Sequence, residues 1–458
     1  MKRKIKLLIR ALFFPCALNF ILLSDAVNQK MSTSQIPFAV RIGVLSILCG
    51  YFLLIYLSLL VMPAFDRVKT GLRARMMLGG RNLVYGGLYS IAAQIAVFLI
   101  FYINKAGPYE FGIGVLTANA ILASAGAFLL IFAGAVRIFF TSRRLSIARR
   151  IVILLTMWIP AVNLFVLIYA CRLVYEEYDF EREKVLLREL RADTELCQTR
   201  YPLLMLHGVG FRDLRYFNYW GRIPAELMRN GAVIYYGNQE AFGTIACNGE
   251  DIRTRIFEIL KETGAEKVNI IAHSKGGLDA RYAISTLKMA PYVASLTTMS
   301  TPHRGCRFVD YACRLPEGLY RFVASCFDRT FGKFGDKNPD FYTATHQFST
   351  KASAQFNREN PNAPGVYYQS YASKMKYPWS HLLLGIPWCI IRPLEGDNDG
   401  LVSIESAKWG DFQEVFTNQR TRGISHGDMI DLKREDYKGF DVVEAYVQLT
   451  AKLKERGF

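Results

Sequence analysis

One serine in this chain has the surroundings of a nucleophile. Ser274 lies in the pentapeptide Ala272-His273-Ser274-Lys275-Gly276, at the end of the predicted buried strand 267–272 and before a predicted helix. A serine on a tight turn between strand and helix needs small residues two before and two after it, because the backbone there is strained. The turn also places the N–H of Lys275 at a helix start, where it can bind an oxyanion. We therefore predict that Ser274 attacks a carbonyl carbon and that Lys275 donates its backbone N–H.

A base and an acid follow in the order that such chemistry needs. The six histidines all lie after residue 200: His207, His273, His303, His346, His381 and His426. The last one alone follows the best candidate acid, Asp399, and imidazole supplies a base with a near-neutral pKa. We predict that His426 is the base and that Asp399 orients it. Asp397 remains a rival for the acid.

A second oxyanion donor is predicted on the first strand of the same region. The run 202–206 ends in His207-Gly208, which would present the backbone N–H of Val209. An ordinary glycine turn is the alternative. His273 and His303 flank the ends of predicted strands, and we interpret them as supporting or packing groups rather than bases.

The elements that must position these residues alternate between strand and helix from residue 201 onward. Apolar runs predict strands, and the periodic segments 251–263 and 442–454 predict helices. The predicted strands are 202–206, 232–236, 267–272, 295–300 and 365–371. Strands that alternate with helices indicate a mainly parallel sheet covered on both faces, an α/β fold.

Seven segments of the region 201–458 resemble, in order, the secreted bacterial true lipases (triacylglycerol lipases) of the α/β-hydrolase fold. They are Tyr201-Pro-Leu-Leu-Met-Leu-His-Gly208, Tyr219-Trp-Gly-Arg-Ile-Pro224, Lys267-Val-Asn-Ile-Ile-Ala-His-Ser-Lys-Gly-Gly277, Ser300-Thr-Pro-His-Arg-Gly305, Ala354-Gln-Phe-Asn357, Asn398-Asp-Gly-Leu-Val402 and Ser425-His-Gly-Asp428. The resemblance implies Ser274, Asp399 and His426 as the catalytic residues. It implies Val209 and Lys275 as the oxyanion donors, and a lipid or other acyl ester as substrate.

A structural calcium ion is the point at which the chain departs from this family. Many such lipases hold calcium between an aspartate two residues after the histidine and a second one before the acid. Asp428 matches the first, but the second would fall near Tyr377-Pro378, where no carboxylate stands. A hard cation prefers several oxygen ligands, and one carboxylate is weak support. We expect no cofactor and no metal.

The segment 306–362 lies between two predicted core strands, where this fold often carries a cap. One apolar stripe recurs there at helical spacing. It consists of Leu319, Phe322, Val323, Cys326, Phe327 and Phe331. The stripe would form a lid over an acyl pocket or a helix packed permanently on the core.

Charge separates the two halves of the chain. The chain has a net charge of +17, yet residues 1–172 hold 19 Lys/Arg against only three acidic residues, and the remainder is nearly neutral. This distribution argues against nucleic-acid binding, which needs a basic face on the folded domain. The nine cysteines form no CxxC pair, so a zinc cluster is not expected.

Four long uncharged runs in the first half predict membrane-spanning helices at 42–62, 82–104, 111–136 and 151–171. A fifth candidate, 7–24, contains Arg10 and Pro15 and follows a basic N-terminus. It could be a cleaved signal peptide, but we expect a retained helix. The spans hold no carboxylate or lysine, which favours an anchor over a transporter.

Basic loops predict the orientation of these helices. The N-terminus and the loops 63–81 and 137–150 are rich in Lys/Arg, whereas 25–41 and 105–110 are not. Because positive loops stay in the cytoplasm, we expect a multi-pass protein whose second half is extracytoplasmic. The charged segment 173–200 predicts a helical linker between a transmembrane domain 1–172 and a hydrolase domain 201–458.

Together these patterns predict a membrane-anchored serine hydrolase that cleaves carboxylic esters. A membrane acyltransferase with the same three residues is one alternative. A membrane sensor or scaffold with a vestigial hydrolase domain is the other. The oligomeric state does not follow from the sequence.

Overall fold

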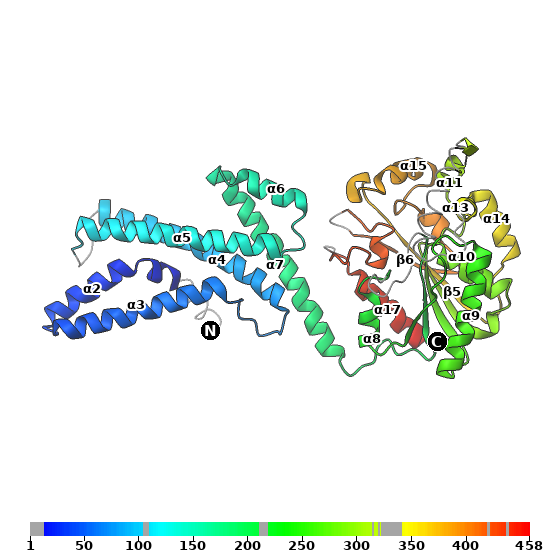
Figure 1. Cartoon of the computed structure of the whole chain (residues 1–458), viewed down its shortest axis with the longest axis horizontal. Helices are drawn as coiled ribbons and strands as arrows, with labels where there is room; N and C mark the ends of the chain where they lie inside the picture. The colour runs from blue at the N-terminus through cyan, green and yellow to red at the C-terminus, as the bar shows by residue number, and fades with distance from the viewer. Residues whose placement is uncertain are drawn as a thin grey trace. The chain divides into compact units, whose positions relative to one another are not determined.

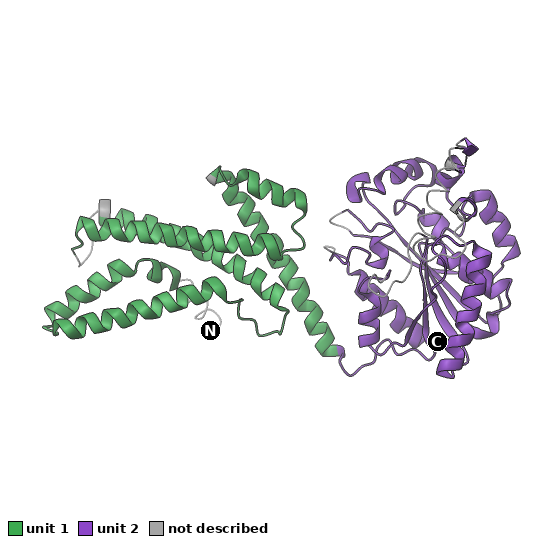
Figure 2. Ribbon diagram, viewed as in Figure 1, with its two compact units in different colours: residues 1–190 green, residues 191–458 purple. Residues whose placement is uncertain are grey.

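The chain forms two compact units, residues 1–190 and 191–458 (Figure 2). The computed structural model describes residues 13–103, 110–209, 219–313, 316–318, 321, 341–418, 422–436 and 439–458. Each unit has its own hydrophobic clusters and is described by itself below.

Helices alone make up the described part of the first unit. They are α2 (Phe20–Thr33), α3 (Phe38–Val61), α4 (Leu72–Val97) with a π-helical extension (Phe98–Ile103), α5 (Ile113–Thr141), α6 (Ile147–Thr156) and α7 (Pro160–Arg191). Within α4 and α5 small residues permit close packing. A Cβ on Gly80 would lie 2.9 Å from the carbonyl oxygen of Gly134, and one on Gly134 would lie 2.6 Å from that of Gly80.

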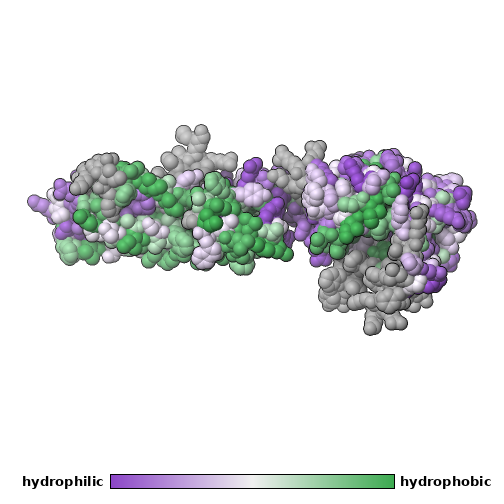
Figure 3. All heavy atoms as spheres, turned by 90° about the horizontal axis from the view of Figure 1, so that it is seen from above, coloured by the Kyte–Doolittle hydropathy of each residue, from purple (hydrophilic) through white to green (hydrophobic). Residues whose placement is uncertain are grey.

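Three of these helices are long and apolar enough to cross a membrane: Phe38–Val61, Leu72–Phe101 and Ile113–Thr141. Their apolar side chains are largely exposed, and Figure 3 shows hydrophobic residues along the surface of this unit. In water such a surface would be unfavourable, and it is suited to lipid.

The other two predicted spans differ from the observed helices. The segment 151–171 is not one helix, because α6 ends at Thr156 and α7 begins at Pro160. Proline lacks the N–H that a continuing helix needs and disfavours helical backbone in the residue before it. Part of the candidate 7–24 lies outside the described residues, and α2 continues past it to Thr33 through Asp25 and Lys30. The predicted linker 173–200 is largely the continuation of α7.

The second unit contains a six-stranded parallel sheet in the order β2-β1-β3-β4-β5-β6 (Figure 1). The strands are β1 (Leu203–Leu206), β2 (Ile234–Tyr236), β3 (Val268–His273), β4 (Val293–Met299), β5 (Tyr367–Ser373) and β6 (Asp411–Phe416). Five of them match the predicted runs within a few residues. The sequence did not predict β6, in which the polar residues Asp411, Gln413 and Glu414 interrupt the apolar ones.

Helices cover both faces of this sheet, as the alternation of strand and helix predicts. The helices are α8 (Ile223–Arg229), α9 (Ile245–Thr263), α10 (Gly276–Ser285), α11 (Arg307–Ala312), α13 (Phe341–His346), α14 (Thr350–Glu359), α15 (Gly385–Glu395), α16 (Ile404–Ala407) and α17 (Val442–Glu455). The predicted cap 306–362 contains α11, α13 and α14. The predicted apolar stripe 319–331 lies outside the described residues.

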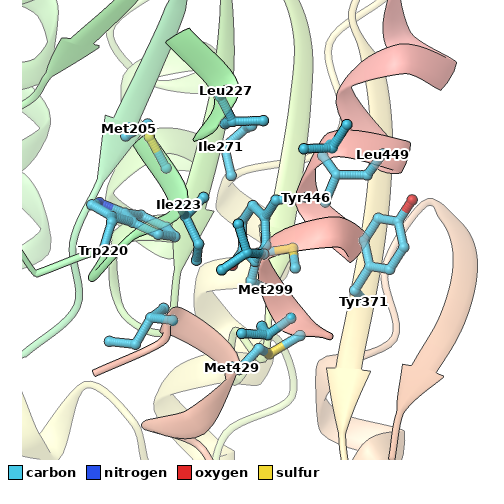
Figure 4. Close-up of a cluster of buried hydrophobic side chains, with 14 of the residues drawn as sticks. Met205, Trp220, Ile223, Leu227, Ile271, Met299, Tyr371, Met429, Tyr446 and Leu449 are labelled. Atoms are coloured by element: carbon cyan, nitrogen blue, oxygen red, sulfur yellow. The ribbon is translucent and has the colours of Figure 1, made fainter. Parts of the chain in front are cut away.

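Alternating residues of each strand feed two separate cores. Leu203 and Met205 of β1 pack with α8 and α17, in the cluster that Figure 4 shows around Trp220 and Tyr446. Leu204 and Leu206 point to the other face, where they pack with α9 and α10. A strand has a side-chain period of two, so both faces of β1 are buried. The sheet is therefore a rigid support for the loops at the carboxyl ends of its strands.

Candidate active site

Ser274 occupies the turn between β3 and α10, at the carboxyl end of a fully buried strand. Its φ angle is +53°, in the left-handed region that non-glycine residues rarely adopt. Its backbone N–H donates to the carbonyl oxygen of Met299 at 2.9 Å, which holds the turn against β4. The side chain stays partly exposed while both neighbouring residues are buried. The strained turn therefore presents a hydroxyl at the surface.

The small residues after the serine allow this turn to form. A Cβ on Gly276 would lie 2.5 Å from the carbonyl oxygen of His207, and one on Gly277 would lie 2.2 Å from Thr301 Oγ1. Any larger residue would push α10 away from β1 and β4. The requirement for a small residue two after the serine thus has a direct steric cause.

The structure brings His426 and Asp399 together. Nδ1 of His426 lies 2.8 Å from Oδ2 of Asp399, and the backbone N–H of His426 donates to the carbonyl oxygen of Asp399 at 2.9 Å. An ionised carboxylate can only accept, so Nδ1 carries the proton and Nε2 keeps a free lone pair. The imidazole is therefore oriented with its basic nitrogen away from the aspartate.

Asp399 is fully buried and well supplied with donors. Its carboxylate accepts from the backbone N–H groups of Leu401 at 3.0 Å and Val402 at 2.8 Å, and from Ser373 Oγ at 3.2 Å. Burial alone would raise the pKa of Asp399, but the nearby His426 and these hydrogen bonds lower it below its ordinary value. Asp399 is thus held as an anion.

The rival acid, Asp397, has other partners. Its carboxylate forms ion pairs with Lys374 and Arg392. It tethers the loop that carries Asp399. The structure therefore pairs His426 with Asp399 and gives Asp397 a supporting role.

Among the residues that the structure describes, no hydrogen bond joins Ser274 to His426. The ring of His273, the residue before Ser274, lies 4.4 Å from the ring of His426, centroid to centroid. In unliganded enzymes the hydrogen bond between nucleophile and base is often long and tightens only when substrate binds. The arrangement places the imidazole beside the serine turn.

The loop after β1 approaches the serine closely, as the oxyanion prediction requires. A Cβ on Gly208 would lie 2.8 Å from the Cβ of Ser274, so only glycine fits there. This contact places the next residue, Val209, beside the serine turn. Within the described part of the chain, neither predicted donor, the N–H of Val209 or of Lys275, is used in a hydrogen bond to another residue.

The side chain of Lys275 takes no part in this arrangement. It is buried and pairs with Asp279 at 2.6 Å, and Asn248 donates to the same carboxylate at 3.0 Å. Burial lowers the pKa of Lys275, and the charge of Asp279 opposes this shift. The pair fixes the first turn of α10, so the backbone of Lys275 is the part that faces the site.

Tyr219 links the two halves of the site, and the sequence analysis did not assign it this role. Its hydroxyl accepts from the N–H of Gly208 at 3.0 Å and lies 2.7 Å from Nδ1 of His273. Burial lowers the pKa of His273 well below its ordinary value, so this histidine is neutral. Tyr219 occurs in one of the seven lipase-like segments, but nothing in its spacing predicts a contact with Gly208.

His303 supports the neighbouring strand end. Its Nδ1 faces Nη1 of Arg281 at 3.3 Å, and its Nε2 lies 3.0 Å from Thr298 Oγ1. Because arginine can only donate, Nδ1 accepts and Nε2 carries the proton. His273 and His303, which we predicted to be supporting groups, are thus both buried and bonded to structural partners.

The described residues do not fit a calcium ion at the position that the family resemblance implies. The carboxylate of Asp428 accepts from the N–H of Ser425 at 3.1 Å and faces Arg422 at 3.4 Å. Arg422 also donates to the carbonyl oxygen of Ser380 at 2.8 Å. Among the described residues no group of three His, Cys, Asp or Glu side chains could hold a metal. A guanidinium therefore occupies the side of Asp428 that a cation would need.

This fold and site define an α/β-hydrolase of the serine type: a parallel sheet, a strained serine turn after β3 and a carboxylate–imidazole pair at the ends of later strands. Residues 219–316 match the family model described as "Putative serine esterase (DUF676)". The chain is 33% identical over 220 residues to a triacylglycerol lipase of Pseudarthrobacter phenanthrenivorans. The aligned residues cover 44% of this chain and 68% of that lipase. The chain belongs to the triacylglycerol lipase family, and it is a carboxylic ester hydrolase.

Two further proteins are similar to this chain. Triacylglycerol lipase 2 of Saccharomyces cerevisiae is 28% identical over 274 residues, which cover 54% of this chain and 77% of the yeast protein. The crystal structure of the mature Bacillus licheniformis lipase BlEst2 aligns with a TM-score of 0.41 and 21% identity, covering 55% of this chain and 91% of that one.

Proposed function

We propose that this protein is a membrane-anchored serine hydrolase that cleaves the carboxylic ester bonds of lipids through an acyl-enzyme on Ser274. The observation that carries the proposal is the pairing of buried Asp399 with His426 at 2.8 Å beside the strained serine turn. The names of the relatives, triacylglycerol lipases, favour a lipid ester as substrate.

In the proposed reaction Ser274 Oγ attacks the ester carbonyl carbon while His426 Nε2 takes its proton. The tetrahedral oxyanion would accept hydrogen bonds from the N–H groups of Val209 and Lys275. His426 then protonates the leaving alcohol, and the acyl-enzyme remains. Water, deprotonated by the same imidazole, releases the carboxylic acid and restores the serine. Asp399 keeps the imidazole in the tautomer that both steps need.

The test uses the full chain in detergent with p-nitrophenyl butyrate, a soluble ester. The wild type should release p-nitrophenol, and Ser274→Ala should remove this activity. A fluorophosphonate should add one phosphonyl group to the peptide that contains Ser274, detected by mass spectrometry. Unchanged turnover in Ser274→Ala, or a label on another residue, would refute the proposal. Product analysis with an added alcohol separates hydrolysis from acyl transfer, since transfer yields a new ester in place of the acid.

The helices of the first unit are proposed to act as a multi-pass anchor, with the hydrolase unit on the extracytoplasmic side. The support is the set of three apolar helices together with the basic loops 63–81 and 137–150, which these helices can hold together on the cytoplasmic side. The extracytoplasmic placement then requires one more crossing, by the segment 151–171, which the structure divides between α6 and α7. A cysteine introduced at exposed Arg253, in a variant with the exposed native Cys389 replaced by serine, should react with a membrane-impermeant maleimide in intact cells beyond the background of the variant without it. Labelling only after lysis would place the hydrolase unit on the other side.

A further inference from the structure

The hydrolase unit carries an apolar patch that its core does not use. The four most exposed large hydrophobic side chains among its described residues are Trp379, Leu382, Leu383 and Ile386, which are 74–93% exposed. Tyr377 lies beside them, and its ring stacks on that of Trp379 with the two ring centroids 4.9 Å apart. We call these five residues the apolar patch. Figure 3 shows hydrophobic surface surrounded by hydrophilic surface on this unit, in the region where Figure 1 places α15.

The backbone under the apolar patch is firmly held, so the exposure does not result from a loose loop. Gly385 lies so close to Pro378 that a Cβ would meet the proline carbonyl oxygen at 2.3 Å. Arg422 donates to the carbonyl oxygen of Ser380 at 2.8 Å, and Trp388 Nε1 donates to that of Met375 at 3.3 Å. A fixed framework therefore presents these side chains outward.

The framework also connects the apolar patch to the candidate active site. A Cβ on Gly400, the residue after Asp399, would meet the Cβ of Leu384 at 2.6 Å. The N–H of Met375 donates to the carbonyl oxygen of Asn398 at 2.9 Å. The segment 377–386 thus packs directly on the loop that carries the proposed acid, and whatever the patch binds is brought close to the site.

We propose that the apolar patch inserts into the headgroup layer of a phospholipid bilayer and so presents the active site to ester substrates in that layer. Tryptophan and tyrosine are the side chains that prefer this region, because they combine an apolar ring with a polar group. The aromatic and apolar side chains carry this argument, because the nearby cations Lys374 and Arg392 already pair with Asp397.

A bilayer suits the apolar patch better than a second copy of the chain does. A stable protein interface buries roughly 800 Å² on each partner, from about 20–30 residues. Five side chains within ten residues are too few for that, but they suffice for shallow insertion. Because the same chain holds the proposed membrane anchor, insertion is intramolecular and needs little intrinsic affinity.

The test of insertion places a genetically encoded fluorescent amino acid at position 383 of the full chain, reconstituted in phosphatidylcholine vesicles with and without phosphatidylglycerol. Phospholipids brominated on their acyl chains should quench the fluorophore, and aqueous iodide should not. The matched control is position 233, where Val233 is 55% exposed on the same unit. There iodide should quench and bromolipids should not. A fluorophore at 383 that iodide quenches, or that neither agent quenches, overturns the proposal.

The functional test rests on the proposed esterase activity and separates failure of the two ideas. Leu382→Asp/Leu383→Asp and the control Val233→Asp are assayed on soluble p-nitrophenyl butyrate and on a long-chain diacylglycerol within vesicles. The ratio of vesicle turnover to soluble turnover should fall at least about tenfold in the patch variant only. An unchanged ratio, or a change of oligomeric state in the variant, refutes insertion. If the wild type cleaves neither ester, the proposed function fails, while the quenching result still decides insertion.

Discussion

Arg422 connects the two segments that a calcium ion would connect in the lipases that this chain resembles. Its guanidinium bridges the carboxylate of Asp428, two residues after His426, and the carbonyl oxygen of Ser380 in the segment where the second metal-binding aspartate is missing. We predict that Arg422→Gln destabilises the hydrolase unit and that chelators leave the wild type unchanged.

The magnitude follows from the contacts that the substitution removes. Asp428 is 1% exposed and Arg422 is 27% exposed, so their pair is only partly screened by water. A hydrogen bond to a charged group contributes about 1.5–3 kcal/mol, and a buried charge left without its partner costs about as much again. In the variant the Asp428 carboxylate still has Lys433 Nζ at 3.9 Å and the N–H of Ser425, and these two groups offset part of the loss. We therefore expect a loss of about 2–4 kcal/mol in the free energy of unfolding.

The assay is thermal unfolding of the full chain in detergent, with p-nitrophenyl butyrate turnover followed in parallel. For a unit of this size the loss corresponds to a decrease in Tm of roughly 4–15 °C. Arg253→Gln is the matched control, because Arg253 is 45% exposed and pairs with Glu250 on the surface at 3.2 Å. Such surface pairs contribute about 0–1 kcal/mol, so its Tm should hardly change. The Tm of Arg422→Lys should lie between the Tm values of these two variants. Lysine keeps the positive charge but lacks the planar guanidinium that can donate to two acceptors at once.

Two results would refute this reasoning. One is a Tm for Arg422→Gln equal to that of the Arg253→Gln control. The other is a decrease in wild-type Tm or turnover on adding EDTA that calcium reverses, because a metal would then hold these segments and the arginine would not.

Three further predictions concern the site and its support. Asp399→Asn should lower kcat on the soluble ester by about 10⁴-fold with little change in KM, because the amide favours the wrong tautomer of His426; a loss of less than tenfold contradicts the assigned role. Tyr219→Phe leaves the N–H of Gly208 without its acceptor, so kcat should fall about tenfold while KM changes little. If the substitution changes only Tm, Tyr219 is a packing residue and has no role in the site. Burial lowers the pKa of His303 well below 6.5, so the unfolded chain binds a proton there that the folded chain does not. The free energy of unfolding should therefore decrease as pH falls below about 6.5, by up to about 1.4 kcal/mol per pH unit for this residue. Denaturant titrations at several pH values should show a shallower decrease in His303→Gln, and an equal slope would exclude the effect.

Much of the sheet could be predicted because its strands are buried on both faces. The run 202–206 is uninterrupted and 267–272 is largely apolar. Such runs occur where helices cover both sides of a parallel sheet. β6 was missed because it is an edge strand in which one side chain of six is buried and three residues are polar, so hydrophobicity could not mark it. The break before α7 was missed because a hydropathy window averages over Pro160, while one missing N–H ends a helix.

In the candidate site, features that depend on neighbouring residues could be predicted, and features that depend on the folded loops could not. The turn that carries Ser274 could be predicted because its requirements are local: a strand before it, a helix after it and small residues at fixed spacing. The pairing of Asp399 with His426 followed from chain order, and the choice against Asp397 was left open, since only the folded loop directs that side chain to Lys374 and Arg392.

Contacts between distant segments could not be predicted from any spacing. Tyr219 reaches Gly208 and His273 because three loops converge at the carboxyl ends of the strands. The same holds for Arg422, which stands where the sequence analysis found only a missing aspartate. A missing metal ligand leaves a buried carboxylate that still needs a positive partner, because an isolated buried charge is strongly unfavourable. Without a metal ion, the buried carboxylate of Asp428 needs another positive partner. Arg422 is that partner, and it lies 45 residues after Tyr377 in the chain.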